Sequence, residues 1–381
     1  MSQIKFAVAT AHGKSAIATV IVQGPNAISL VGQVFRPLNR KSQLAASALS
    51  DEFGQIVYGN WLYQGQVGED LIVCAVNSEH VEIHCHGSIA ALEIISQTLI
   101  DQGAEQLDRE SMADLLAGGR YFGELSRAAT KATTTTTAKI LLPQKKLHAD
   151  FWQTVRSELS SGQGEGATKL LDEYLNWQEF GLALTRPFKI VLCGSPNVGK
   201  SSLTNAILGF DRAIVHDIAG TTRDLISEVT AIAGWPVEIT DTAGIRNASD
   251  GVERQGIEIT RQSIKAADLI VLIVDLVEFD ERELDQQIKN HRPDLVIGNK
   301  SDLSDTTSER FDLIVSATQR TNLNALMNLM VSRLVPQRPD DNAVIPVTKY
   351  HAEIAMKVRK AISEGKLEEA NGLINEIIGM H

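Results

Sequence analysis

The chain has 381 residues, of which 43% are hydrophobic and 22% charged. This composition excludes a disordered or collagen-like chain, and the length suffices for two or three domains that each bury a core. With 36 Lys and Arg against 47 Asp and Glu, the formal net charge of −11 excludes binding to nucleic acid by bulk attraction, so any RNA contact must come from a local basic patch.

The sequence carries no evident targeting segment. Its start, Met1–Phe6, lacks the long apolar core of a signal peptide. The longest apolar stretch, Leu269–Val277, is interrupted by Asp275 and is too short to span a bilayer. The 3 cysteines form no C-x-x-C pair, so we expect them to be reduced. These features predict a cytoplasmic protein without a membrane span.

Residues 4–103 alternate between strand-like and helical patterns, which predicts a small domain of mixed α and β structure. His84, Cys85 and His86 could be taken for metal ligands, but alternation along a strand sends Cys85 to the opposite face and disfavours such a site. The expected strands are Phe6–Thr10, Ala16–Val22, Leu71–Val76 and His80–His84, and the expected helices are Asn26–Phe35 and Ile89–Gln102.

Residues 120–184 show a helical, polar pattern, and a last helical stretch begins at about Val347. Within the first of these regions lie five consecutive threonines, Thr133–Thr137. Because β-branching restricts the side-chain rotamers available in a helix, this run predicts a loop or the edge of a strand.

Between these helical regions, apolar runs alternate with helical patterns, which indicates βαβ units and a mostly parallel sheet. The expected strands are Lys189–Cys193, Val237–Thr240, Leu269–Asp275, Leu295–Gly298 and Phe311–Val315.

A phosphate-binding loop follows the first of these strands. Gly194-Ser195-Pro196-Asn197-Val198-Gly199-Lys200-Ser201 matches G-x-x-x-x-G-K-S and opens a helical pattern, and this context disfavours a chance glycine-rich turn. In such a loop, backbone N–H groups surround a phosphate at a helix N-terminus, Lys200 contacts phosphate oxygens and Ser201 ligates Mg²⁺. The loop residues expected to contact the nucleotide are Asn197, Val198, Gly199, Lys200, Ser201 and Ser202.

A second strand ends in Asp241-Thr242-Ala243-Gly244, which places a carboxylate where it can reach Mg²⁺ through water and an amide where it can sense a γ-phosphate. The intervening loop Gly220–Asp224 offers a threonine that could complete the Mg²⁺ shell.

Asn299-Lys300-Ser301-Asp302 follows a third strand. The Asp302 carboxylate can accept both N1–H and the exocyclic amine of guanine, a donor pair that adenine lacks, so the nucleotide is GTP rather than ATP. Ser316 and Ala317 fit the backbone contact to guanine O6. Four elements in this order predict an enzyme that binds and hydrolyses GTP.

Hydrolysis requires a group that orients water, and Ras-like switches use a glutamine where this chain has Ile245. With Asn197, Asp217–Asp224 and Asp241–Glu253, the chain resembles the tRNA modification GTPase family TrmE, also called MnmE. The resemblance implies a Ras-like P-loop GTPase domain inserted in a helical domain, with a small N-terminal α+β domain. The corresponding domains are residues 1–118 for folate binding and dimerisation, 119–185 with 338–381 for the helical domain, and 186–337 for the GTPase domain.

Members of this family hydrolyse GTP when their G domains dimerise, and K⁺ takes the place of an arginine finger. The resemblance implies that Glu253 orients water beside the catalytic Lys200, although from the residues alone Glu253 could equally be a solvated helix-face charge. The family usually has a small hydroxyl residue at His216, a tolerable change if only the carbonyl contacts K⁺. The implied ligands are Ser201 and Thr222 for Mg²⁺, and Asn197, His216, Ile218 and Thr221 for K⁺, with Asp217, Ala219 and Gly220 as further GTP contacts.

The N-terminal segments Ala7–Ala18, Gly24-Pro25 and Val81–Gly87 also resemble this family. That resemblance implies a homodimer that binds 5-formyl-tetrahydrofolate, the one-carbon donor for wobble-uridine modification of tRNA with the partner GidA (MnmG). Ile21 stands where the family has a folate-contacting arginine, which leaves Glu82 as a folate ligand or a structural residue. Counterparts of two further family segments are lacking, and Ile377–His381 lacks the Cys-x-Gly-Lys tail.

These departures predict an intact GTPase part with folate and tail chemistry reduced or lost. The leading hypothesis is a TrmE-type GTPase that acts in tRNA wobble-uridine modification. The second is a divergent GTP-dependent switch without one-carbon chemistry, which acts on a partner such as the ribosome or a membrane complex. The third is a ribosome-assembly GTPase of the Era or Der type, which would need an RNA-binding appendage.

Overall fold

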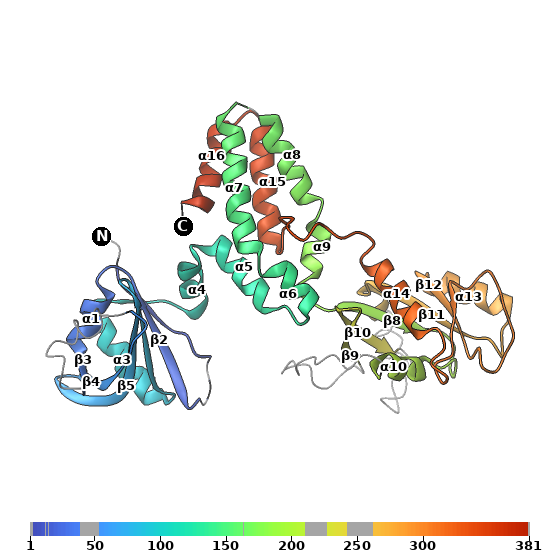
Figure 1. The fold of residues 1–381 in the computed structure, drawn as a ribbon, viewed down its shortest axis with the longest axis horizontal. Coiled ribbons are helices and arrows are strands. Elements are labelled where there is room, and N and C mark those ends of the chain that lie inside the picture. Colours follow the sequence, from blue (N-terminus) through green and yellow to red (C-terminus); the bar gives the residue numbers. More distant parts are fainter. Residues whose placement is uncertain are drawn as a thin grey trace. The chain divides into compact units, whose positions relative to one another are not determined.

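The computed structural model describes residues 3–11, 13, 15–38, 53–162, 164–209, 227–241 and 262–379. The chain divides into two compact units, residues 1–123 and 124–381, and each contains its own β-sheet (Figure 1). No helix within the described ranges combines the length and the apolar character needed to cross a membrane.

The first unit is built on a seven-stranded sheet in the order β3-β4-β5-β6-β2-β1-β7. Its pairs are antiparallel except for β1 with β7. The strands are β1 (Lys5–Val8), β2 (Ile17–Gln23), β3 (Phe35–Pro37), β4 (Ile56–Tyr63), β5 (Gln66–Asn77), β6 (His80–His86) and β7 (Glu105–Gln106), and the helices are α1 (Ala27–Val34), α3 (Ile89–Asp101) and α4 (Arg109–Ala117).

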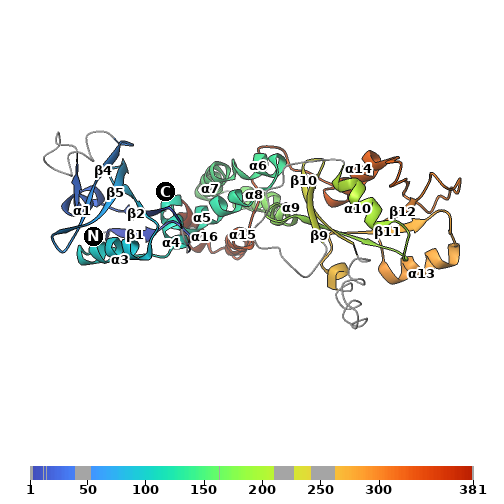
Figure 2. The same ribbon diagram turned by 90° about the horizontal axis from the view of Figure 1, so that it is seen from below.

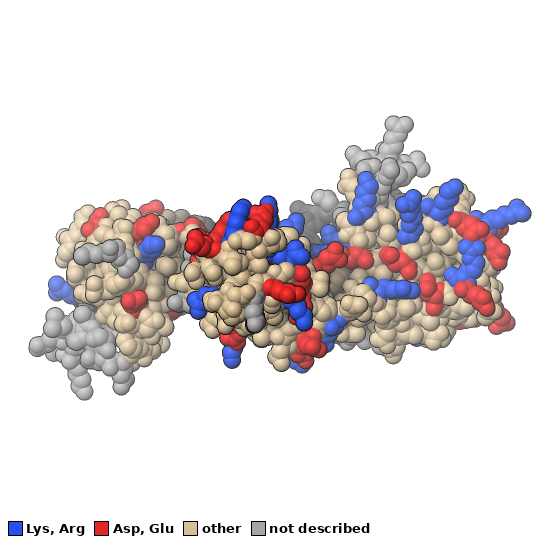
Figure 3. Space-filling model, turned by 90° about the horizontal axis from the view of Figure 1, so that it is seen from above, with Lys and Arg blue, Asp and Glu red and all other residues tan. Residues whose placement is uncertain are grey.

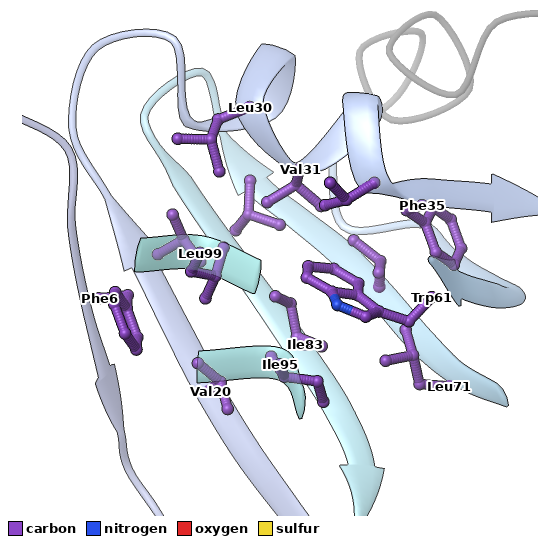
Figure 4. Close-up of a cluster of buried hydrophobic side chains, with 14 of the residues drawn as sticks. Phe6, Val20, Leu30, Val31, Phe35, Trp61, Leu71, Ile83, Ile95 and Leu99 are labelled. Atoms are coloured by element: carbon purple, nitrogen blue, oxygen red, sulfur yellow. The ribbon is translucent and has the colours of Figure 1, made fainter. Parts of the chain in front are cut away.

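Helices α1 and α3 cover one face of this sheet, and the core lies between the helices and the strands (Figure 4). Trp61 and Ile83 project from the strands toward Leu99 of α3 in this cluster. Alternation along β6 sends Cys85 into the core while Glu82 and His84 lie on the other face, as the strand pattern predicted. The side chains of Glu82 and His84 therefore lie on the face of the sheet that α1 and α3 do not cover.

Part of the second unit is a bundle of helices, which come from both ends of that unit's sequence. Helices α7, α8, α15 and α16 pack against one another around buried Trp152 and Tyr174. The helices of this region are α5 (Arg120–Thr130), α6 (Thr135–Leu141), α7 (Gln144–Ser160), α8 (Gly164–Leu175), α9 (Gln178–Ala183), α15 (Lys349–Ser363) and α16 (Leu367–Ile378).

The prediction of a loop or strand edge at Thr133–Thr137 is wrong, because α6 begins within this run. Thr134 is the N-cap, and its Oγ1 accepts a hydrogen bond from the Thr137 N–H at 3.3 Å. In return, the Thr134 N–H donates to Thr137 Oγ1 at 3.3 Å. This reciprocal cap stabilises a helix start by about 1 kcal/mol, enough to offset the small propensity cost of the β-branched residues.

The rest of the second unit contains a six-stranded sheet in the order β13-β12-β11-β8-β10-β9. All pairs are parallel except β9 with β10, which confirms the predicted mostly parallel sheet. The strands are β8 (Phe188–Cys193), β9 (Ser227–Ile232), β10 (Trp235–Asp241), β11 (Leu269–Asp275), β12 (Leu295–Asn299) and β13 (Leu313–Ile314), and the helices are α10 (Lys200–Leu208), α13 (Glu281–His291) and α14 (Leu323–Leu334).

Helix α13 covers one face of this sheet, and α10 with α14 covers the other (Figure 2). The central strand β8 has β11 on one side and β10 on the other, so the chain order reverses there. Ligands of open α/β sheets bind beyond the carboxyl ends of the strands at such a point. The carboxyl ends of β8, β10 and β12 therefore lie at the edge of the sheet where the sequence predicts the nucleotide.

The amino end of β10 packs against the helical part. Trp235 lies edge-on to Phe180 of α9, with ring centroids 6.0 Å apart. The preceding Gly234 has a φ of +82°, and a Cβ added there would lie 2.3 Å from Thr136 Oγ1 of α6. The turn before β10 therefore requires glycine.

Candidate functional site

The loop between β8 and α10 has the backbone of a phosphate cradle. Gly194, Asn197 and Gly199 all have positive φ angles, which asparagine tolerates and glycine adopts freely. A Cβ on Gly194 would lie 2.3 Å from the Ile273 carbonyl oxygen, so the sheet leaves no room for a side chain. Because α10 begins at Lys200, the N–H groups of its first turn are available to an anion.

Lys200 is held across this loop. Its Nζ donates hydrogen bonds to the carbonyl oxygens of Gly194 at 3.0 Å and Ser195 at 2.7 Å. The side chain is buried, with 4% of its surface exposed. The ammonium group is thus fixed beside the position that the motif assigns to the phosphates.

Ser201 and Asp241 meet at the neighbouring strand end. The Ser201 hydroxyl donates a hydrogen bond to Asp241 Oδ2, and β10 carries Asp241 alongside Leu192 of β8. Hydroxyl and carboxylate oxygens are ligands that Mg²⁺ accepts. These two residues could hold Mg²⁺, Ser201 directly and Asp241 through water, as the sequence predicts.

Asn299 joins the phosphate loop to the loops that are predicted to contact guanine. It is buried at the end of β12, where its Nδ2 donates to the Val198 carbonyl oxygen at 2.9 Å. Its Oδ1 accepts a hydrogen bond from the Ala317 N–H at 3.1 Å. Gly199 faces this amide so closely that a Cβ there would lie 2.3 Å from Asn299 Nδ2. One side chain therefore connects three loops.

The rest of the guanine-reading segment is also fixed by side-chain contacts. Lys300 Nζ donates to Asp275 Oδ2 at 2.6 Å, and the backbone of Lys300 has a φ of +68°. The Ser316 hydroxyl donates to Asp302 Oδ1 at 2.6 Å. The structure thus places the Asp302 carboxylate beside the segment predicted to contact guanine O6.

The described residues bring together most of the predicted nucleotide contacts. Asn197 is exposed at the tip of the phosphate loop, and Ser202 is exposed on the first turn of α10. The remaining predicted residues, which lie outside the described ranges, are His216, Asp217, Ile218, Ala219, Gly220, Thr221, Thr222, Thr242, Ala243, Gly244 and Glu253.

Two contacts of this site were missed by sequence reasoning. Asp275, the partner of Lys300, could have been found as a carboxylate at the end of a strand beside β8. The hydroxyl of Ser195 is bonded to Glu283 and Gln287 of α13, and the G-x-x-x-x-G-K-S motif gives no signal for this contact. Burial raises the pKa of the Cys85 thiol to about 11 and that of Cys193 to about 12, which favours the protonated form of both near neutral pH.

The candidate folate residue Glu82 lies on β6 between two histidines. Its carboxylate oxygens are 3.2 Å from His84 Nε2 and 3.6 Å from His80 Nε2. Ile21 of β2 stands directly opposite Glu82 in the strand register. An apolar side chain therefore occupies the position beside Glu82 where the family resemblance expects an arginine.

A separate group of Glu69, Asp70 and His86 lies near the end of β6. The hydrogen bond from His86 to Glu69 raises the pKa of the imidazole, and the Tyr58 hydroxyl lowers the pKa of Asp70 by donating to it at 2.7 Å. These side chains thus satisfy one another as a charged surface network.

Two protein-family models match the chain. The model described as GTP-binding protein TrmE N-terminus matches residues 4–109, and the model described as 50S ribosome-binding GTPase matches residues 189–300. Each of the two matches therefore falls on one of the two sheets.

Among curated proteins, the tRNA modification GTPase MnmE of Thermotoga petrophila is 32% identical, over 98% of this chain and 95% of the relative. The MnmE proteins of Lactococcus lactis subsp. lactis and Carboxydothermus hydrogenoformans are 28% and 32% identical. The first alignment covers 98% of this chain and 90% of the relative, and the second covers 78% and 72%.

Proposed function

The chain belongs to the family of the tRNA modification GTPases MnmE and is a GTP hydrolase, and from this premise we propose that it uses K⁺-assisted GTP hydrolysis in the modification of tRNA wobble uridines. One observation carries the proposal: Lys200, the Ser201–Asp241 pair and Asn299 are all brought to one edge of the sheet. This arrangement supports a single site for the phosphates, Mg²⁺ and guanine.

The bound groups would divide the chemistry. Mg²⁺ neutralises charge between the β- and γ-phosphates when bound, and Ser201, Thr222 and Asp241 would hold it. Asn197, which has a φ of +62° in the phosphate loop, would offer its side-chain oxygen to K⁺ together with Thr221 and the carbonyls of His216 and Ile218.

Glu253 would orient the attacking water, while Lys200 stays on the phosphates. We also propose that the G domains pair and that the protein forms a homodimer through residues 1–118. The helical domain would comprise residues 119–185 and 338–381, and the GTPase domain residues 186–337, because β8 begins at Phe188 and α14 ends at Leu334.

GTP turnover measured in KCl and in NaCl tests the mechanism. We expect faster hydrolysis in K⁺, and we expect Glu253→Ala to lose turnover while binding GDP as the unchanged chain does. Equal rates in both salts, or full activity of Glu253→Ala, would refute the assignment of K⁺ and of the water-orienting residue.

A role in tRNA modification requires a partner of the GidA (MnmG) type and contact with tRNA in the cytoplasm. On the face shown in Figure 3, acidic and basic side chains of residues 124–379 are interspersed, without a broad positive area among the coloured atoms. Nucleoside analysis of tRNA from cells lacking this protein tests the role, with loss of the modified wobble uridine expected. Normal modification would refute it.

The pairing of Ile21 with Glu82 favours a second candidate, a GTP-dependent switch without one-carbon chemistry. An arginine at position 21 could pair with the folate carboxylates, and isoleucine cannot. Calorimetric titration of 5-formyl-tetrahydrofolate onto the full chain separates the candidates. Binding at a defined stoichiometry supports the modification enzyme, and its absence supports the switch.

A further inference from the structure

The second residue of the phosphate loop is fixed from outside the loop. The Ser195 hydroxyl donates to Glu283 Oε1 at 2.6 Å and accepts a hydrogen bond from Gln287 Nε2 at 2.8 Å. Gln287 Nε2 also donates to Glu283 Oε1 at 2.8 Å, which closes a triangle of three side chains. The single hydroxyl thus uses both its donor and its acceptor capacity.

Both partners of Ser195 stand on one face of α13. Glu283 and Gln287 are four residues apart, so their side chains lie one above the other on the helix. The helix itself is well anchored: Asp280 caps its start by accepting hydrogen bonds from the N–H groups of Arg282 and Glu283, and Leu284 is buried in the core beside β11. The triangle therefore ties the loop to a rigid element of the sheet.

The anchored residue is also one that holds Lys200. The Ser195 carbonyl oxygen accepts the hydrogen bond from Lys200 Nζ at 2.7 Å. On its other side, the neighbouring Gly194 is pressed against the Ile273 carbonyl, with no space for a side chain. The first half of the loop is thus fixed by the sheet behind it and by α13 beside it.

We propose that Glu283 and Gln287 are positioning residues for GTP binding, which act through Ser195 to keep the phosphate loop in its binding conformation. Without the triangle, Ser195 and its carbonyl are free to leave this geometry, and the loop must be reordered whenever phosphates bind. Such reordering lowers affinity without changing any direct contact to the nucleotide. Neither α13 residue touches the nucleotide in this account.

The test uses the full chain and the dissociation of a fluorescent GDP analogue. Ser195→Ala and Glu283→Ala should each speed dissociation by about three- to tenfold, the range for a hydrogen-bond pair at a partly exposed site. The double variant should be no faster than the faster single variant, because both changes remove the same anchor. Ser195→Thr, which keeps the hydroxyl, should restore the original rate.

Glu281→Ala is the matched control for Glu283→Ala, since Glu281 is an exposed carboxylate in the first turn of α13 and is not part of the triangle. Melting temperatures of all variants separate this role from a loss of folding. An unchanged rate for Glu283→Ala, or additive effects in the double variant, would overturn the proposal. Because the assay measures nucleotide binding at one fixed salt composition and not hydrolysis, failure of this proposal is distinguishable from failure of the proposed roles of K⁺ in hydrolysis, of folate and of tRNA.

Discussion

Replacing Asn299 with alanine removes the side chain that connects three loops of the nucleotide site. The Val198 carbonyl loses a donor at 2.9 Å, and the Ala317 N–H loses an acceptor at 3.1 Å. Each buried polar group left unpaired costs about 1–3 kcal/mol, so with two such groups we expect the loops to lose about 2–6 kcal/mol of local stability. That is a large share of the total stability of a domain.

Hydrogen exchange measured by mass spectrometry would detect this loss. In Asn299→Ala, the peptide that contains Ala317 should exchange faster, since its amide no longer has an acceptor. Asn299→Asp keeps that acceptor but cannot donate to Val198, so it should show an intermediate effect. Asn290→Ala, on the exposed surface of α13, is the control.

Equal exchange in Asn299→Ala and Asn290→Ala would refute the reasoning.

Three further predictions follow from other contacts. Gly234→Ala should lower the melting temperature more than Gly65→Ala, since both glycines have φ near +80° but only an added Cβ at 234 meets Thr136, at 2.3 Å. Burial and the neighbouring His351 lower the pKa of fully buried His148, so the unfolded chain binds the extra proton. The free energy that neutral His148 contributes to folding should be complete above about pH 6.5. Below that pH, the free energy of unfolding should fall by up to about 1.4 kcal/mol per pH unit. Urea unfolding of His148→Gln should show a smaller slope with pH. Asp302→Asn should weaken GDP binding at least tenfold while XDP binding improves, because an amide can donate to the C2 oxygen of xanthine; unchanged selectivity in competition binding would contradict the assigned role.

The described part of the candidate nucleotide site could be anticipated because its residues are specified by local sequence. Gly194 and Gly199 indicate a loop whose positive φ angles and close neighbours require glycine. The spacing of the motif then places Lys200 and Ser201 at the start of α10. Asp241 could be placed because parallel strands end at a common edge. Periodicity likewise predicted most strands of the second sheet.

Other features depended on contacts that no local pattern reveals. The threonine run folds as a helix start because Thr134 and Thr137 cap each other, which propensity averages ignore. Strand β4 was missed because Gly59 and Asn60 interrupt its pattern, although Gly59 is required by a close approach of the Arg36 carbonyl. The Ser195 anchor joins residues 88 positions apart and is visible only in three dimensions.

Strand β10 carries a tryptophan, Trp235, whose intrinsic fluorescence can report on the nucleotide site. All four tryptophans lie in the described part of the chain, and Trp235 is the one on a strand that ends in the nucleotide site, at Asp241. Strand β10 pairs with β8 and β9 and connects Trp235 to Asp241, so we expect a shift of the strand on Mg²⁺ binding at Asp241 to alter the packing of the indole against Phe180. Intrinsic fluorescence could therefore follow nucleotide exchange in real time, without an attached dye.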